Sequence, residues 1–230
     1  MTPPTHQALC ARVKRHGLIA AECAALTGGR PDDDGIAPCD RVDRIDRAAY
    51  THRALRVLAA GQDFDELRGA IEDVHRIGLA TDRFRIDVHD PGHRSTLSSV
   101  AVATTLATGF DGRPDLSTPR HRFIVVVGNE RWTFGEVVAE SDASYRRHES
   151  KPWTTSSSLD SRFARGLVNL VPDARSVLDP CCGAGSIVVE AASLGLDAFG
   201  VDWKPAMVGM TTKNLAHFGY HATVVRADSR

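Results

Sequence analysis

Cysteine is sparse in this sequence of 230 residues, and its spacing follows no metal-binding or disulfide pattern. The five cysteines stand at positions 10, 23, 39, 181 and 182, without a C-x-x-C pair and without histidine at a matching spacing. Structural zinc sites need such paired ligands, and a disulfide framework needs an even set of cysteines. The sequence therefore predicts neither a disulfide framework nor a metal site.

Long apolar runs and an excess of charge of one sign are also missing. No apolar stretch approaches the roughly 18 residues of a membrane-spanning helix, and the first residues lack the basic and apolar regions of a signal peptide. We therefore expect a soluble, cytoplasmic protein. The 28 Lys and Arg residues and 29 Asp and Glu residues leave a net charge of -1, so any binding to a nucleic acid has to rely on local basic patches.

The chain nevertheless has enough apolar sequence for a sizeable core. With 42% hydrophobic residues in 24.9 kDa, it can form one large domain or two small ones. Apolar residues at near-helical spacing over residues 5–26, followed by Gly28 and Gly29, predict a first helix. The acidic, turn-forming stretch 31–35 predicts a solvated loop, so we assign residues 1–40 to an N-terminal region.

Residues 41–140 have a mixed pattern that is typical of an α+β region. Apolar spacing predicts helices over residues 64–77 and 96–106, and alternation predicts a strand over residues 84–88. Two strand-like segments, 122–127 and 132–138, flank a Gly-Asn-Glu spacer, which predicts a β-hairpin. Residues 141–158 are polar and are predicted to form a linker.

The last third of the chain, residues 159–230, alternates strands with helices. It starts with a helix capped by Ser158 or Asp160. Segments 176–179, 198–202 and 222–228 are predicted strands, the first of them buried, with helices over residues 186–194 and 205–218 between them. Such alternation implies a parallel sheet with right-handed crossovers. The predicted fold class is α/β: a mixed α+β region followed by the first βαβαβ half of a Rossmann-like sheet.

The segment DPCCGAG, residues 179–185, lies where the first of these strands turns into a helix. In doubly wound sheets this is the ligand-binding end. Gly183 and Gly185 let the backbone turn tightly, and the N–H groups that begin the helix suit a carboxylate such as that of methionine. Dinucleotide-binding folds use the same loop, so the glycines alone do not identify the cofactor. The Asp-Pro before them resembles motif I of amino-group methyltransferases and favours S-adenosylmethionine over a nucleotide.

Acidic residues also end the next two strands. Asp202 is a candidate acceptor for ribose hydroxyls, and the resemblance places a carboxylate near the adenine amino group at Asp228. Trp203 is a candidate for packing on adenine. An ordinary cap, loop or rim residue is the alternative at each of these positions. Cys181 and Cys182 suggest a nucleophile pair for cytosine-carbon methylation, but their place in the cofactor loop favours a packing role.

A wider resemblance extends upstream of this motif. Residues 112–119, which lead into the predicted hairpin, resemble the end of a THUMP domain, an RNA-binding module. Residues 151–170 resemble the segment that precedes motif I in THUMP-containing tRNA guanine-N2 methyltransferases, where it helps close over the cofactor. The resemblance implies a THUMP-like region over residues 41–140. It also implies transfer of a methyl group from S-adenosylmethionine to an exocyclic amine of RNA, with tRNA as the expected partner.

The resemblance supplies a set of cofactor-binding candidates but no catalytic residue. The family's Asp/Asn-Pro-Pro-aromatic motif, which orients the amine, does not occur before Arg230. The candidates lie in the cofactor loop, at the strand ends and in the closing segment: Asp179, Pro180, Cys181, Cys182, Gly183, Ala184, Gly185, Ser186, Asp202, Trp203, Asp228 and Ser158.

Two other functions stay open. One is a catalytically silent fragment or subunit that binds the cofactor or RNA, and the other is a DNA amino-methyltransferase, which leaves residues 112–138 unexplained. In this fold the strand 176–179 normally pairs on both sides, and its second neighbour is the fourth strand, which is missing here. We therefore expect an open edge at this strand, as in a gene fragment or in a half that a partner chain completes. Candidate phosphate contacts lie on the hairpin and linker: Arg120, Arg122, Arg146, Arg147 and Lys151.

Overall fold

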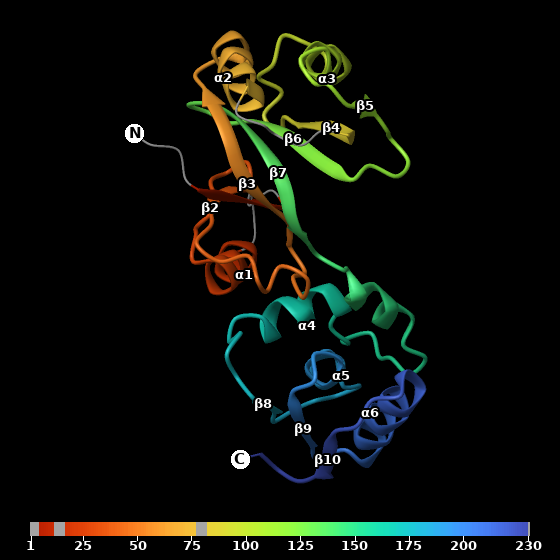
Figure 1. The fold of residues 1–230 in the computed structure, drawn as a ribbon. Coiled ribbons are helices and arrows are strands. Elements are labelled where there is room, and N and C mark those ends of the chain that lie inside the picture. The colour runs from red at the N-terminus through yellow and green to blue at the C-terminus, as the bar shows by residue number, and fades with distance from the viewer. Residues whose placement is uncertain (1–4, 12–16, 77–81, 230) are drawn as a thin grey trace. The chain divides into compact units, whose positions relative to one another are not determined.

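The computed structural model describes residues 5–11, 17–76 and 82–229, which form two compact units (Figure 1). Unit 1 takes its residues from ranges 1–16, 27–45 and 52–140, and unit 2 from ranges 17–26, 46–51 and 141–230. The chain passes back and forth between the units. The helix α1 (Gly17–Thr27) lies almost wholly in unit 2, whereas the strands before and after it lie in unit 1. The domain boundaries that the sequence suggested remain predictions.

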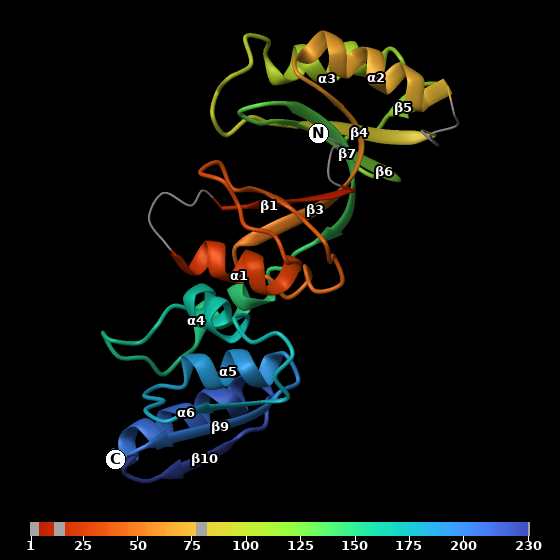
Figure 2. The same cartoon turned by 90° about the vertical axis from the view of Figure 1, so that its left-hand side faces the viewer.

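Unit 1 contains a seven-stranded mixed sheet in the order β2-β1-β3-β7-β6-β4-β5. The helices α2 (Phe64–Arg76) and α3 (Ser99–Ala107) lie on one face of this sheet (Figure 2). Between helices and sheet lies an aromatic core that includes Phe84, Phe123 and Phe134. The strands are β1 (His6–Cys10), β2 (Ile36–Pro38), β3 (Thr51–Gly61), β4 (Arg83–His89), β5 (Arg113–Pro114), β6 (His121–Val127) and β7 (Trp132–Glu140).

Most predictions for the middle of the chain are confirmed. The strands β6 and β7 form the expected antiparallel hairpin, in which Val127 pairs with Trp132. The helices α2 and α3 and the strand β4 also lie where apolar spacing and alternation predicted them. Local periodicity sufficed for α2, α3 and β4 because each places one apolar face on the core, whereas β6 is a continuous apolar run that is buried on both faces.

The predicted first helix over residues 5–26 is wrong in its first part. Residues His6–Cys10 form the strand β1, whose Ala8 pairs with Ala37 of β2. Ala8, Leu9 and Cys10 are all buried, which a surface helix with a single apolar face would not allow. Pairing with a strand far along the chain thus overrode the helical spacing, and Val13, which contributed to that spacing, lies outside the described residues.

Unit 2 contains a parallel three-stranded sheet in the order β10-β9-β8, which confirms the predicted βαβαβ arrangement. The helices α5 and α6 pack on one face of this sheet (Figure 2). Asp160 caps α4 by accepting a hydrogen bond from the N–H of Phe163 at 2.7 Å. The elements are the 3-10 helix η1 (Ser144–Ser150), α4 (Ser161–Val168), β8 (Ser176–Asp179), α5 (Ser186–Ser193), β9 (Asp197–Asp202), α6 (Pro205–Phe218) and β10 (Thr223–Arg226).

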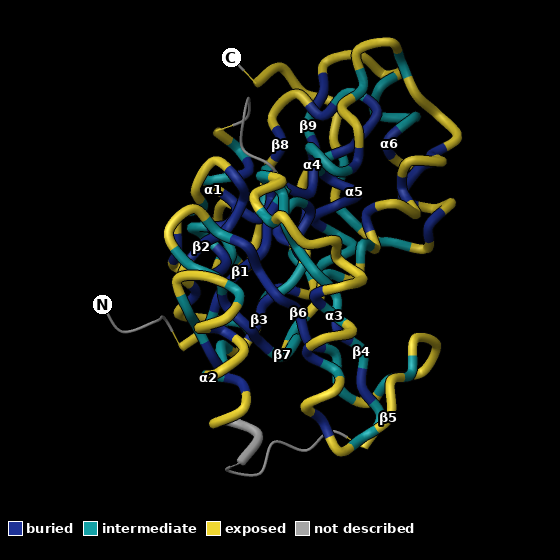
Figure 3. Tube along the Cα trace, turned by 90° about the horizontal axis from the view of Figure 1, so that it is seen from above, coloured by how far each residue is buried: buried dark blue, intermediate teal, exposed yellow. Residues whose placement is uncertain are grey.

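The other face of the unit 2 sheet is open, and the prediction that its first strand is buried is wrong. Leu178 is 62% exposed, and Phe199 and Val225 on the same face are 42% and 45% exposed. Within the part of the chain that the structure describes, β8 is an edge strand and the helices cover only the opposite face. Figure 3 shows the chain after β10 as exposed as well. An apolar edge and face of this kind are typical of a surface that another polypeptide segment covers.

A buried polar network joins the helices of unit 2. Glu190 of α5 accepts a hydrogen bond from Arg165 Nε at 2.8 Å, and its other oxygen lies 2.6 Å from His148 Nδ1. Arg165 also donates to Ser193 Oγ, and His148 Nε2 lies 3.0 Å from the hydroxyl of Tyr220. Glu190, Arg165 and His148 are at most 1% exposed. Residues 141–158 are therefore not a plain polar linker, because η1 inserts His148 into the core.

A second group of hydrogen bonds connects α1 to the rest of unit 2. Glu22 of α1 is fully buried and accepts hydrogen bonds from the backbone N–H groups of Ala49, Tyr50 and Thr51. The amide of Asn169, at the end of α4, donates to the same carboxylate at 2.7 Å. The carboxylate thus satisfies donors from two segments at once.

Over the described residues, no helix combines the length and apolarity that crossing a membrane requires.

Candidate functional site

The loop between β8 and α5 has the sharp backbone turn that its glycines predicted. Gly183 and Gly185 have φ angles of 54° and 84°, in the left-handed region that glycine adopts most readily. A Cβ at Gly185 would also lie 2.6 Å from Thr211 Cγ2, so there is no room for a side chain. The N–H of Cys182 donates to the carbonyl of Val201 at 2.8 Å, which ties the loop to the neighbouring strand β9. The loop leads directly into α5, whose first N–H groups have no partner within the helix.

Asp202 holds the loop from the end of β9. Its Oδ2 accepts a hydrogen bond from the N–H of Gly183 at 3.0 Å, and its Oδ1 accepts one from the N–H of Lys204 at 2.9 Å. The residue is 8% exposed, so the carboxylate is fixed rather than free in solvent. Each carboxylate oxygen can accept a further hydrogen bond, which leaves Asp202 able to bind a hydroxyl donor.

Asp179 ends β8 beside the same loop. It is 9% exposed, and its Oδ1 accepts a hydrogen bond from the N–H of Cys181 at 3.1 Å. Burial raises the pKa of this carboxyl, and the negative charge of Asp202 adds to the increase, against the opposing effect of the Cys181 bond. A cationic group placed beside Asp179 would relieve both effects.

Two neighbouring cavities flank the loop and share Cys181 as a lining residue. The first has a volume of about 270 Å³, and the loop and residues 155–159 form its walls. The second has a volume of about 350 Å³ and lies over the ends of β9 and β10. Both lie at the carboxyl ends of three parallel strands, where ligands bind in such folds.

Eleven of the predicted residues line one cavity or the other. Gly185 instead packs against Thr211. Trp203 is 65% exposed at the rim, and the ammonium of Lys204 lies 5.2 Å from its ring centre. The first cavity takes Ser158, Asp179, Cys181, Cys182, Gly183, Ala184 and Ser186, and the second takes Pro180, Cys181, Asp202, Trp203 and Asp228.

The first cavity also has lining residues that we did not predict. They are Thr155, Ser157, Leu159, Ile187 and Met207. Resemblance to a cofactor-closing segment was the available signal for Thr155, Ser157 and Leu159, because all three lie within it. For Met207, on the first turn of α6, the sequence contains no comparable signal.

The two cysteines of the loop differ in exposure. Cys182 is buried, burial raises the pKa of its thiol, and its Sγ lies 3.7 Å from Thr211 Oγ1. A thiol whose pKa is raised is a poor nucleophile near neutral pH. Cys181 is exposed and lines both cavities. The geometry supports the packing role predicted for Cys182.

The five candidate phosphate contacts fall into three groups. Arg146 and Arg147 are exposed on η1. Arg120 and Arg122 of unit 1 are paired with acidic residues, Arg120 with Asp82 at 2.8 Å and Arg122 with Glu140 at 2.5 Å. Lys151 is the one that the structure contradicts: it is 8% exposed, burial lowers its pKa, and its ammonium donates to the carbonyl of Leu159. Lys151 therefore supports the cavity wall and does not face a solvent-exposed phosphate.

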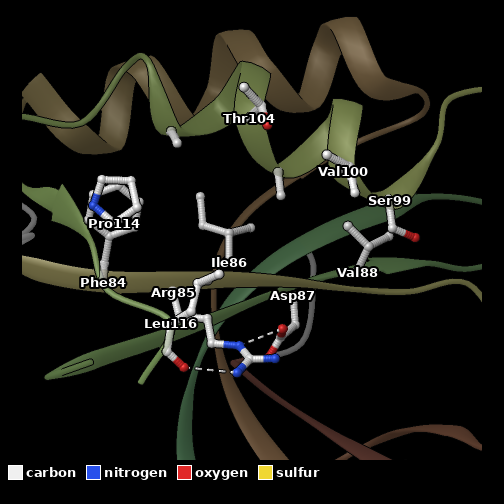
Figure 4. Close-up of a pocket in the computed structure, with 12 residues that line it drawn as sticks. Phe84, Arg85, Ile86, Asp87, Val88, Ser99, Val100, Thr104, Pro114 and Leu116 are labelled. Carbon is white, nitrogen blue, oxygen red and sulfur yellow. Dashed lines mark hydrogen bonds and ion pairs between the residues drawn. The ribbon is translucent and has the colours of Figure 1, made fainter. Parts of the chain in front are cut away.

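A separate apolar cavity of about 510 Å³ lies in unit 1, between β4 and α3. Ile86 and Val88 point into it from β4, whereas Arg85 points away and bonds to Asp87 and to the carbonyl of Leu116 (Figure 4). Its apolar lining does not resemble the loop and carboxylates of the site in unit 2.

Comparison with known proteins agrees with this geometry. Residues 148–228 match the family described as RMKL-like, methyltransferase domain. The chain is 32% identical over 198 residues to the tRNA (guanine(10)-N2)-dimethyltransferase of Pyrococcus abyssi, and 28% identical over 196 residues to that of Methanothermobacter thermautotrophicus. These matches cover 83% and 80% of the chain but only 59% and 57% of the relatives, so the chain spans less than two thirds of their length.

Solved structures share the fold at lower identity. TrmN from Thermus thermophilus matches 97% of this chain with 73% of its own, at 20% identity and a TM-score of 0.57. A protein from Clostridium difficile 630 described as a possible methylase also matches 97% of this chain with 75% of its own, at 15% identity and a TM-score of 0.52. At these identities, the likeness concerns the fold alone.

The parallel sheet, the glycine loop and the carboxylates at the strand ends are features that Rossmann-like methyltransferase domains use to hold their cofactor. This geometry agrees with the match of residues 148–228 to the RMKL-like methyltransferase domain family. The cofactor of such a domain is S-adenosylmethionine. The residues present fit its groups, since a helix N-terminus suits a carboxylate, buried Asp179 suits an ammonium, and Asp202 suits ribose hydroxyls.

Proposed function

We propose that this chain supplies the cofactor site and RNA contacts of a tRNA guanine-N2 methyltransferase. The observation that carries the proposal is the pair of adjoining cavities at the ends of β8, β9 and β10, with a carboxylate at or just beyond each strand end. The named relatives supply the tRNA and guanine-N2 parts of the proposal. With tRNA as the proposed substrate, we also propose a cytoplasmic location.

Each end of the site has its own role in this proposal. S-adenosylmethionine, when bound, supplies a methyl group activated by its sulfonium. In the cavity of about 270 Å³, Asp179 pairs with the ammonium, and the N-terminus of α5 binds the carboxylate. In the cavity of about 350 Å³, Asp202 accepts bonds from ribose hydroxyls, while Asp228 and Trp203 bind adenine.

In the proposed reaction, these residues perform little acid–base chemistry. Their task is to hold the cofactor so that an exocyclic amine can approach the methyl group in line, and correct positioning lowers the barrier by converting an encounter into a bound geometry. The residue that accepts the amine's hydrogen bond is unassigned among residues 148–228. The exposed face at Leu178, Phe199 and Val225 is the proposed docking surface for the polypeptide segment that supplies it, in this chain or in a partner chain.

Arg146 and Arg147 are the proposed RNA contacts in unit 2. Both are exposed, and neighbouring Tyr145 and His148 are buried and anchor η1. Two guanidinium groups on an anchored turn can each bind a phosphate without sequence selectivity. The paired residues Arg120 and Arg122 would first have to leave Asp82 and Glu140, so their proposed share of phosphate binding is smaller.

The test is to incubate the chain with S-adenosylmethionine and unmodified tRNA transcripts, then to measure nucleosides by mass spectrometry. Where the chain or an added partner supplies the acceptor, the expected product with wild type is N2-methylguanosine. With Asp202→Ala its formation should slow in step with the weaker binding of the cofactor. Appearance of N6-methyladenosine, or methylation of DNA instead of tRNA, would overturn the proposal in favour of an adenine-directed enzyme. Cofactor binding without any product would show that the chain lacks the acceptor, as a catalytically silent binding protein or a half completed by a partner chain does.

A further inference from the structure

One face of α6 contacts the cofactor loop through two polar residues that the sequence did not single out. Thr211 and Asn214 lie three positions apart, and so on the same side of the helix. Both are 0% exposed, although threonine and asparagine are mostly surface residues. Buried polar side chains are retained when each of their groups is hydrogen-bonded, so their partners indicate what they do.

Thr211 and Asn214 bind successive carbonyl groups of the loop. The hydroxyl of Thr211 donates to the carbonyl of Gly183 at 2.8 Å. The amide of Asn214 donates to the carbonyl of Ala184 at 2.9 Å. With Gly185 packed against the Thr211 side chain, these bonds fix the orientation of the peptide groups that lead into α5. The loop carbonyls are thereby held toward α6, which leaves the opposite side of the loop to the cavity.

Asn214 also binds the segment that leads into the second wall of the same cavity. Its Nδ2 donates to the carbonyl of Trp153 at 2.7 Å, and its Oδ1 accepts from the N–H of Trp153 at 3.1 Å. Trp153 is followed by Thr155, Ser157 and Ser158, which line the cavity opposite the loop. One fully buried amide therefore connects the closing segment to the cofactor loop.

We infer that Thr211 and Asn214 are positioning residues for the cofactor: Thr211 sets the peptide orientation of the loop, and Asn214 fixes the spacing between loop and closing segment. This inference rests on the proposed use of the cavity for S-adenosylmethionine. Neither side chain lines the cavity, so both act through the backbone groups that they hold. Their removal therefore weakens binding of the cofactor without removing a contact to it.

The first test is isothermal titration of the full chain with S-adenosylhomocysteine, comparing three threonine variants. Thr211→Val keeps the shape but loses the hydroxyl, and we expect affinity to fall about five- to tenfold, the effect of one lost hydrogen bond to a buried carbonyl. Thr211→Ser keeps the hydroxyl and should remain within about twofold of wild type. The matched control is Thr212→Val, because Thr212 is exposed and its hydroxyl bonds only along its own helix, to Val208.

The second test measures hydrogen–deuterium exchange by mass spectrometry without any ligand. Asn214→Ala should speed exchange in peptides covering residues 153–158 and 183–186 together, whereas Thr211→Val should affect only the loop peptide. Peptides of the strand β10 should be unchanged in both variants, which separates local release from general loss of stability.

The outcomes distinguish this inference from the proposed function. If wild type binds the ligand and Thr211→Val binds equally well, or if Asn214→Ala leaves exchange of residues 153–158 unchanged, the positioning role is wrong and the cofactor site stands. If folded wild-type chain does not bind the ligand at all, the proposed function is wrong, and the positioning role fails with it.

Discussion

Different interactions stabilise the interiors of the two units. Unit 1 buries an apolar, aromatic core in which Phe123 stacks on Phe134 with ring centres 5.0 Å apart, and its ion pair between Arg56 and Glu136 is partly exposed. Unit 2 buries charged groups, with Glu190 and Arg165 both at 0% exposure. Apolar packing is not directional, whereas hydrogen bonds fix particular atoms. The unit that has to present backbone groups to a cofactor is thus the one built on directional bonds.

The largest expected effect comes from breaking the buried network. Arg165→Met removes the guanidinium that bonds to Glu190 and Ser193, and it leaves a buried carboxylate short of a partner. We expect the free energy of unfolding of unit 2 to fall by about 3–5 kcal/mol. Urea unfolding followed by circular dichroism measures this. Arg175→Met is the control, since Arg175 is exposed; equal losses in the two variants would show that the network does not stabilise the unit.

The next effect separates binding from stability at Asp179. Asp179→Asn keeps an oxygen for the Cys181 N–H but removes the charge, so affinity for S-adenosylhomocysteine should fall by about 1.5–3 kcal/mol. Because the folded-state pKa of Asp179 is raised, its contribution to stability is present at low pH and is lost as pH rises through that pKa.

The amide variant has no such loss, so its melting temperature should gain on that of wild type as pH rises above the ordinary aspartate pKa of about 3.9. Thermal melts of the unliganded proteins across this range measure the difference. A variant that loses stability relative to wild type as pH rises, or that binds the ligand as tightly as wild type, would show that the Asp179 carboxylate is not the buried anion described here.

A smaller effect is expected from the aromatic core of unit 1. Phe123 is fully buried against Phe110 and Phe134, and Phe123→Leu should lower the stability of this unit by about 1–2 kcal/mol. Affinity for S-adenosylhomocysteine should not change, because no residue of the two cavities belongs to unit 1. Calorimetric melting of the variant gives its stability, and titration gives its affinity for the ligand. A parallel loss of affinity would argue against separate roles for the units.

The smallest effect is expected at the surface of unit 1. Arg56 pairs with Glu136 at 2.5 Å, but its side chain is 52% exposed. Arg56→Ala should therefore change the free energy of unfolding by less than about 1 kcal/mol, in contrast to Arg165→Met. Urea unfolding at low and high salt tests this, and a loss as large as that of the buried arginine would remove the distinction between the two kinds of ion pair.

The sequence predicted the fold best where local pattern and long-range packing agree. In the last third, each helix and strand has its own apolar spacing, so the βαβαβ order could be found from periodicity. Residues 6–10 show the limit, since their strand depends on pairing with Ile36–Pro38. The open face at Leu178 was missed for a related reason: an apolar strand predicts burial, but which face the helices cover is decided by the assembled sheet.

The candidate site shows the same division. The loop glycines and the acidic residues could be found from the sequence, because they follow predicted strands directly. The structure places them at one edge of the sheet. Thr211 and Asn214 could not be found in this way, because a polar residue on a helix normally faces solvent. His148 and Lys151 likewise suggested a polar linker until the structure placed both in the interior.

The most direct test of this account is titration of the purified, folded chain with S-adenosylhomocysteine, with Asp202→Ala as the variant. Asp202 both holds Gly183 and lines the second cavity, so its loss should weaken binding by about 1–3 kcal/mol. The account predicts micromolar binding by wild type and this loss in the variant. Folded wild-type chain that does not bind, or a variant that binds equally well, would contradict the assignment of the cavities to the cofactor.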